Sequence, residues 1–385
     1  MTLEDLFGGV YGRGGAAAAT SGRAWLQAML EVEAALVRAC ARERLVPTEA
    51  AATIAAACRV ERFDLQAISA EGAEHATPVV PLVRALRRQV GEELARYVHL
   101  GATSQDIVDT AAMLVAKRAS EFVVADARAA IGAAAGLAQD HRGTAMSGRT
   151  LLQQALPTTF GLRAAGWLVG LHEATVRLAE ERERGLAVQM GGPVGARAPS
   201  VAEHVAAELG LVAPTLPWHT VRVRVAALAG ALGTLAGVLA KIARDVTLLS
   251  QNEVEEVREG GSGRGGSTVM AHKRNPVAAV SVLACARRVP GLIATILACM
   301  EQEHERAAGA WQAEWGTMSD LLALTGSAAS WGRDLLERLE IDRRRMRENL
   351  TRLAAAGVAE AAEPEMHLGA SSELIDRALA AASTA

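Results

Sequence analysis

Apolar residues in the centre of the chain recur with the period of a long amphipathic helix. Their spacing alternates between four and three residues, at Leu228, Leu232, Leu235, Leu239, Ile242, Val246 and Leu249. This heptad spacing keeps one apolar seam on a single helix face. Because no proline interrupts residues 222–259, we predict one helix over that range. It is about 55 Å long at ~1.5 Å per residue and packs in a bundle of similar helices.

Two further stretches have the composition of long helices. Residues 104–141 contain no proline and no glycine before Gly132, and residues 292–339 continue the mixed apolar and polar pattern. Half of the chain is apolar but only 3% is aromatic. Since alanine and leucine supply much of this apolar content, helix is favoured over strand. We therefore predict an all-α protein with a central bundle of long helices.

The length of 385 residues exceeds what one compact core usually holds. We predict three domains. Residues 1–98 form an N-terminal domain of short helices. Residues 99–345 form the central bundle with a mobile loop at residues 260–276, and residues 346–385 form a short C-terminal helical domain.

Charge and hydropathy exclude several classes of partner. The net charge of −3 gives no basic surface for nucleic acid. The N-terminal segment MTLEDLFGGV lacks the features of a signal peptide. The longest apolar stretch, near residues 225–240, is too short for a membrane span and lies between Arg224 and Lys241. The 4 cysteines form no CxxC pair, as is usual for reduced core thiols. We expect a cytoplasmic protein with no nucleic-acid or membrane partner.

A glycine-rich segment followed by polar residues is the strongest sign of chemistry. Glycines crowd residues 260–266, and the polar residues that follow are Ser267, Thr268, His272, Lys273, Arg274 and Asn275. Glycine frees backbone amides to face a ligand, and lysine and asparagine add donors, so the segment suits a carboxylate or a dianionic intermediate. Pro276 then suits the first position of a new helix. The alternative is a flexible surface connection.

The same segment matches the dinucleotide-binding pattern G-x-G-x-x-G only formally. That fingerprint follows a strand, whereas here we expect a long helix before Gly261. No G-K-[ST] sequence is present in the loop, so it is not a P-loop either. A nucleotide-binding protein is therefore the weakest of the alternatives.

The segment GGSTVMAHKRNP resembles the signature loop of the fumarase/aspartase superfamily, G-S-S-x-M-P-x-K-x-N-P. Thr268 and Ala271 depart from this pattern, and the matching residues are Gly266, Ser267, Met270, Lys273, Asn275 and Pro276. HLGATSQDIVDTA and GRTLLQQALPTTFG resemble the first and second conserved blocks of that superfamily. PWHTVRVR and ERAAGAWQAEW are similar to bacterial 3-carboxy-cis,cis-muconate cycloisomerases.

The resemblance implies a three-domain, all-α fold with a shortened C-terminal domain. It implies a cofactor-free cycloisomerase or lyase that acts on a small polycarboxylate, in aromatic catabolism by the β-ketoadipate pathway. The family reaction removes a proton beta to a leaving group through an aci-carboxylate intermediate, and lactonisation is the same chemistry in reverse. It also implies a homotetramer whose active sites combine blocks from several subunits. No His, Cys and carboxylate cluster has metal-ligand spacing, so we expect no metal.

The resemblance also assigns site residues. Ser267 is the expected base, and fixed donors stabilise the dianion that it generates. The expected substrate-binding residues are Thr103, Ser104, Gln105, Thr150, Gln154, Lys273 and Asn275, with His272, Arg274 and Thr77 beside them. Thr103 to Asp106 also fits a capping box at a helix start, which is compatible with anion binding there. We expect structural roles for Asp106, His219, Arg306 and Trp311.

One departure from the family leaves the proton donor open. Leu151 and Gln154 stand where members carry the histidine of the second block, and Val280 stands where many carry a supporting glutamate. Glutamine donates a hydrogen bond but carries no proton at neutral pH. Three possibilities therefore remain open: the cycloisomerase, a lyase that releases fumarate from a nitrosuccinate-, aspartate- or adenylosuccinate-like substrate, and a non-catalytic homologue.

Overall fold

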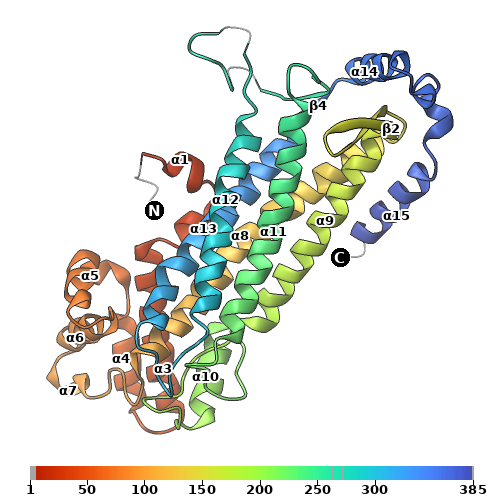
Figure 1. Ribbon diagram of the computed structural model, residues 1–385. Helices are drawn as coiled ribbons and strands as arrows, with labels where there is room; N and C mark the ends of the chain where they lie inside the picture. Colours follow the sequence, from red (N-terminus) through yellow and green to blue (C-terminus); the bar gives the residue numbers. More distant parts are fainter. Residues whose placement is uncertain (1–5, 262–263, 271–272, 384–385) are drawn as a thin grey trace.

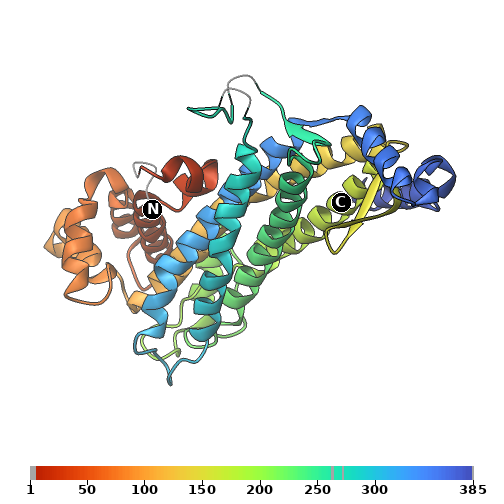
Figure 2. The ribbon, with the colours of Figure 1, turned by 45° about the horizontal axis from the view of Figure 1, so that its top comes forward.

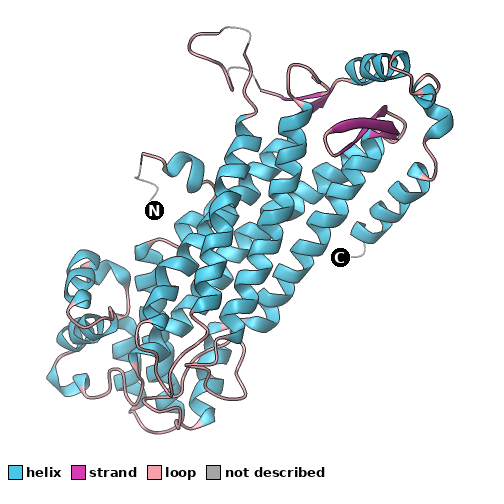
Figure 3. Ribbon diagram, in the orientation of Figure 1, coloured by secondary structure: helices cyan, strands magenta, loops and turns pink. Residues whose placement is uncertain are grey.

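Long helices that run up and down one bundle dominate the computed structural model, which describes residues 6–261, 264–270 and 273–383 (Figure 1). The bundle helices are α8 (Ser104–Asp140), α9 (Phe160–Glu180), α11 (Val223–Leu249), α12 (Val277–Ala298) and α13 (Ala310–Glu337). They pack side by side as α8 against α9 and α13, and α11 against α9, α12 and α13. The expected all-α architecture is confirmed (Figure 3).

Shorter elements gather at the two ends of this bundle (Figure 2). One end carries α3 (Gly22–Arg42), α4 (Thr48–Ala57), η1 (Val60–Arg62), α5 (Leu65–Ala73), α6 (Val79–Val90), α7 (Glu92–Ala95) and α10 (Pro199–Leu209). The other end carries β1 (Ala145–Thr150), β2 (Gln153–Thr159), β3 (Val257–Glu259), β4 (Leu339–Ile341), α14 (Arg343–Ala355), η3 (Ala359–Ala361) and η4 (Pro364–His367). The remaining elements are α1 (Gly8–Tyr11), α2 (Gly15–Ala19), η2 (Glu181–Gly185) and α15 (Ser371–Ser383).

The apolar seam of α11 lies in the core as its spacing predicts. All seven seam residues, from Leu228 to Leu249, are no more than 2% exposed. The helix ends at Leu249, however, and the prediction that it continues to residue 259 is wrong. After a turn in which Glu255 has a φ of 50°, residues Val257–Glu259 pair with β4 instead. This pairing partner lies far along the chain, so helical periodicity alone could not reveal it.

The predicted helical stretch at residues 292–339 is also divided. Helix α12 ends at Ala298, and α13 begins at Ala310 after Gly309, which has a φ of 112°. The intervening turn reverses the chain at the end of the bundle where α8 begins (Figure 1). Helices α11 and α12 are apolar and long enough to cross a membrane by length and composition. That is weak evidence, because core helices of soluble proteins pass the same test, and 50% and 39% of their apolar windows are buried within this chain.

Candidate active site

The signature loop holds Ser267 in a tight turn. The Ser267 Oγ accepts hydrogen bonds from the amides of Val269 (3.3 Å) and Met270 (3.1 Å). The serine is half-buried, and Lys273 on the other arm of the loop is exposed. Amide donors aimed at a hydroxyl oxygen favour its deprotonated form, because they stabilise negative charge there. The turn therefore caps its own backbone and also supplies what a serine base needs.

Backbone contacts join the two arms of this loop at its stem. The Asn275 amide donates to the Gly265 carbonyl (2.8 Å), and Gly266 forms an antiparallel bridge with Arg274. Gly265 has a φ of +69°, and a Cβ there would overlap the Asn275 carbonyl oxygen. Only glycine fits this position. His272, one of the expected substrate-binding residues, lies outside the described residues.

Glu259 closes the base of the loop. Its carboxylate accepts hydrogen bonds from the amides of Ala278 (2.9 Å) and Ala279 (2.8 Å), at the start of α12. A helix N-terminus attracts an anion through such amides, and this one is occupied by a side chain of the same chain. The sequence pattern did not indicate Glu259, because an N-cap normally lies next to its helix and this residue is 19 positions away.

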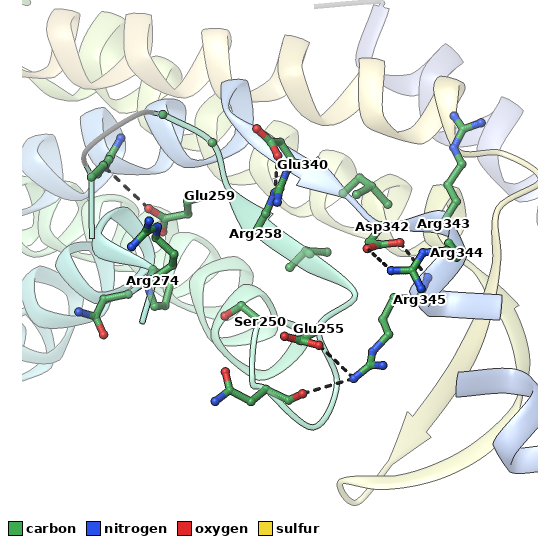
Figure 4. A pocket seen from close by; sticks show the side chains of 18 residues that line it. Ser250, Glu255, Arg258, Glu259, Arg274, Glu340, Asp342, Arg343, Arg344 and Arg345 are labelled. Atoms are coloured by element: carbon green, nitrogen blue, oxygen red, sulfur yellow. Dashed lines mark hydrogen bonds and ion pairs between the residues drawn. The ribbon is translucent and has the colours of Figure 1, made fainter. Parts of the chain in front are cut away.

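A polar cleft of about 930 Å³ lies beside the loop stem (Figure 4). Arg274 and Asn275 line one end of it, and the first residues of α14 line the other. Its arginines are largely paired, for example Arg345 with Glu255 (3.0 Å). The cleft is thus a charged environment that an anionic substrate can approach, and Asn275 and Arg274 face it.

The second block forms the hairpin of β1 and β2. Its tip residues Leu151 and Leu152 have φ values of 49° and 65° and are 97% and 75% exposed. Thr150 and Gln154 flank the tip and are also exposed, so both are open to a ligand. The hairpin is fixed at Arg149, whose guanidinium binds the buried carboxylate of Glu256 at 2.8 and 2.7 Å.

The first block lies at the start of α8, where Thr103 and Asp106 form the expected capping box. Asp106 is fully buried and accepts hydrogen bonds from the amides of Thr103 (3.1 Å), Gly191 (2.9 Å) and Gly192 (2.8 Å). The His219 Nε2 lies 2.8 Å from its Oδ1. Asp106 and His219 thus have the structural roles expected of them, and they fix the turn that carries Thr103.

Buried charges surround the inner face of this block. The Gln105 side chain is 1% exposed and donates to Asp109 Oδ2 (3.1 Å) and to the His219 carbonyl (2.7 Å), so its donors point into the protein. Arg222 pairs with Asp109 (2.7 Å) and with Glu314 through its Nε (3.0 Å). Burial alone would lower the pKa of Arg222, but these two carboxylates raise it. Of the three block residues, Thr103 and Ser104 remain half-exposed.

Other residues expected to bind or to support the site occupy nearby positions. Thr77 is 8% exposed, and its hydroxyl accepts from the amide of Val79, the first residue of α6, at 3.3 Å. The Arg306 guanidinium donates to the Gly192 carbonyl (2.6 Å). Trp311 is buried and donates to Asp109 (2.9 Å).

The sequence pattern did not indicate the pair of half-buried His99 and buried Glu33 near the same block. The His99 Nδ1 lies 2.6 Å from Glu33 Oε1. Burial alone would lower the pKa of His99, but the charge and hydrogen bond of Glu33, with Asp106 further away, raise it above its ordinary value. No local pattern could show this pair, because its members are 66 residues apart.

The three blocks do not meet within one chain. Thr103 and Ser104 lie at the start of α8, whereas the hairpin and the loop lie at the opposite end of the bundle (Figure 1). Helix α11 connects the two ends with 27 residues, which separates them by about 40 Å at ~1.5 Å per residue. A small substrate cannot contact Ser104 and Ser267 of the same chain.

Comparisons with known proteins agree with this architecture. Residues 16–291 match the lyase family. The chain is 47% identical over 354 residues to a 3-carboxy-cis,cis-muconate cycloisomerase of Bradyrhizobium diazoefficiens, with 89% of this chain and 78% of the relative covered. It is 45% identical over 351 residues to a nitrosuccinate lyase of Streptomyces davaonensis, with 86% and 74% covered.

A solved structure is similar over almost the whole chain. The crystal structure of the 3-carboxy-cis,cis-muconate lactonizing enzyme from Pseudomonas putida superposes with a TM-score of 0.90 at 36% identity. The match covers 98% of this chain and 99% of that one. The overall fold of this chain is therefore close to that of an experimentally determined structure.

Proposed function

The chain belongs to the lyase family of the fumarase/aspartase superfamily, and on that premise we propose that it is a 3-carboxy-cis,cis-muconate cycloisomerase. The observation that carries this proposal is the similarity to such cycloisomerases at 43–47% identity over most of the chain. The matching fold and the turn around Ser267 support it. The reaction converts an open-chain tricarboxylate into a lactone without an external co-reactant.

The proposed mechanism uses the donors of the signature loop. A carboxylate oxygen of the substrate forms a bond to an alkene carbon, and the alkene electron pair moves into the neighbouring carboxylate as an aci-carboxylate dianion. Lys273 and Asn275 stabilise that dianion by charge and hydrogen bonding. The adjacent carbon then takes a proton from Ser267, and solvent restores the serine proton. In the reverse direction the Ser267 alkoxide, stabilised by the amides of Val269 and Met270, removes that proton.

We also assign substrate contacts to the other two blocks. Thr103 and Ser104 are positioned to bind a substrate carboxylate at the start of α8, and Thr150 and Gln154 to contact the substrate from the hairpin. Gln105, whose donors are used internally, contributes through its backbone amide, and Thr77 contributes a substrate contact from the start of α6. In the loop, we assign further substrate contacts to His272 and Arg274.

The proposal includes a homotetramer in which each site combines blocks from different subunits. It is supported by the ~40 Å between blocks in one chain and by apolar side chains left exposed on α12, among them Val280 and Leu297 at 52% each. Long helices that bury only part of their apolar surface within one chain suit a bundle shared among subunits. We propose that the enzyme acts in the cytoplasm, in aromatic catabolism. We also propose that its three domains are divided after residues 98 and 345.

A second candidate function is a lyase that releases fumarate from a substituted succinate such as nitrosuccinate. It is favoured by Leu151 and Gln154, which provide no imidazole at the hairpin. A good leaving group needs less acid assistance, so turnover of such a substrate would not require an imidazole in this hairpin. The 45% identity to a nitrosuccinate lyase supports the same alternative.

An ultraviolet assay separates these functions. Purified protein is mixed with carboxymuconate and, in parallel, with a panel of substituted succinates, with Ser267→Ala as control. We expect the diene absorbance to be lost with the wild type, and the rate of this loss to fall about 10²–10⁴-fold in the variant, because it lacks the group that donates the proton in this direction. Fumarate from one of the succinates would instead identify the lyase. If neither carboxymuconate nor any of the succinates is turned over, the protein is a non-catalytic homologue.

A further inference from the structure

We propose that Arg264 is a positioning residue, whose ion pair with Asp334 fixes Ser267 and Asn275 relative to the helix bundle. The proposal rests on the proposed function of the loop and extends it to a residue that acts through its neighbours rather than on the reacting atoms. The loop stem is held together mainly by backbone contacts, and the proposal explains what fixes its position relative to α13.

The contacts of Arg264 lead from the loop to the bundle. Its Nη2 lies 2.5 Å from Asp334 Oδ2 on α13, and its Nε lies 3.9 Å from Glu259 Oε2. The guanidinium also lies over the ring of Trp331, 5.5 Å from the ring centre. The ion pair with Asp334 is thus the close contact of this loop side chain, and Glu259 and Trp331 lie further away.

Asp334 is a shared anchor with an excess of positive charge around it. Its side chain is 11% exposed and also pairs with Arg338 (2.8 Å) and Arg13 (3.7 Å). Burial alone would raise the pKa of Asp334, but Arg264, Arg13 and Arg338 outweigh this and lower it. The carboxylate is therefore charged at neutral pH, and a half-buried pair of this kind is screened less by salt than an exposed pair.

Arg264 lies only a few residues and one backbone hydrogen bond away from the proposed reacting groups, so a shift of Arg264 would also shift them. The next residue, Gly265, accepts the Asn275 amide at 2.8 Å, and Ser267 follows two residues later. On the far side, Glu259 caps α12 directly after Pro276. Figure 4 shows Glu259 and Arg274 together at this end of the cleft. Loss of the Arg264 anchor leaves the N-terminal arm of the stem without its side-chain contact to α13.

The expected consequence is a loss of catalysis rather than of folding. Displacement of a reacting group by about 1 Å costs on the order of 10²-fold in rate. We therefore expect Arg264→Gln and Asp334→Asn to lower kcat by about 10–100-fold, with a smaller change in KM. Arg264→Lys retains the charge and recovers part of the loss.

Arg338→Gln is the matched control, because it removes a partner of the same carboxylate that lies outside the loop. The experiment measures kcat, KM and melting temperature for these variants, together with hydrogen exchange at the Asn275 amide. We expect faster exchange and lower kcat in Arg264→Gln and Asp334→Asn, and wild-type behaviour in Arg338→Gln.

Equal effects in Arg264→Gln and Arg338→Gln, or wild-type kcat and exchange in Arg264→Gln, would overturn the proposal. A lower melting temperature with unchanged kcat would reduce Arg264 to a structural residue and overturn it as well. If the wild type turns over no substrate, the proposed function fails, and the exchange at Asn275 still decides whether Arg264 fixes the stem.

Discussion

A serine hydroxyl is a poor base in water, and the proposed base Ser267 has neighbours that would stabilise its deprotonated form. Two amides donate to its oxygen, and Lys273 lies on the facing arm of the same loop. These residues lie in one contiguous segment that resembles the signature loop of the superfamily, so the sequence alone was enough to propose Ser267, Lys273 and Asn275. Glu259 could not be proposed in this way, because its partners Ala278 and Ala279 come after the loop.

For the histidines, too, the sequence indicated some features and not others. His219 could be assigned a structural role from the sequence, but its partner Asp106 is 113 residues away. The pairing of His99 with Glu33 was not foreseeable either. Long-range ion pairs depend on how helices are placed relative to one another, and hydrophobic periodicity does not specify their polar contacts.

The raised pKa of His99 gives a prediction for stability against pH. A group whose pKa is higher in the folded state contributes its full stabilisation below its unfolded pKa and loses it as pH rises through the folded value. We therefore expect the free energy of unfolding to decrease above the ordinary histidine pKa of about 6.5.

Urea unfolding of the wild type and of His99→Gln, over about pH 6 to 9, measures this contribution. The difference between the two proteins should shrink as pH rises. A difference that grows with pH would show that Glu33 does not hold His99 in its charged form.

Among the elements, the hairpin packs on α14 through Ala145 and also shares a buried ion pair with the rest of the molecule. Arg149 on β1 binds Glu256, which precedes β3, and Asn349 on α14 donates to the same carboxylate at 2.9 Å. Three elements far apart in the sequence thus converge on a carboxylate that is fully buried. The sequence indicated that a second block exists here, but not what fixes it.

Removal of one partner should therefore destabilise the protein strongly. Arg149→Met leaves the Glu256 charge buried and is expected to cost about 3 kcal/mol, the lower part of the range for a broken buried pair. Denaturant titration measures the change. The control Arg258→Gln removes the exposed pair with Glu340 and is expected to cost less than about 1 kcal/mol. Equal losses in the two variants would contradict a special role for the buried pair.

Some helices have features that the local sequence pattern alone was enough to predict. The seam of α11 and the cap of α8 were predicted from local pattern and are present. The end of α11 was not, because residues 257–259 gain more by pairing with β4 than by continuing a helix. The resulting strand precedes the glycine loop but pairs antiparallel in a two-stranded sheet, and the next helix begins only at Val277. A dinucleotide site of the βαβ type therefore has no support at Gly261.

At the scale of the whole molecule, the distance between the blocks is the central feature. Thr103 and Ser104 lie at one end of the bundle, and Ser267 lies at the other (Figure 1). The resemblance to the superfamily suggested that blocks combine across subunits, and the chain in isolation gives the physical reason. In the proposed composite site, the loop end of one copy lies beside the α8 start of another.

Mixing two inactive variants tests this account most directly. One chain carries Ser267→Ala, the other carries Thr103→Ala with Ser104→Ala, and each is inactive by itself. After co-refolding, we predict that activity on the substrate found in the ultraviolet assay returns to about a quarter of wild type, the fraction of randomly mixed sites that receive both intact blocks. Light scattering should show a tetramer. Activity no higher than the sum of the separate variants, in a mixed tetramer of the expected mass, would contradict the composite site.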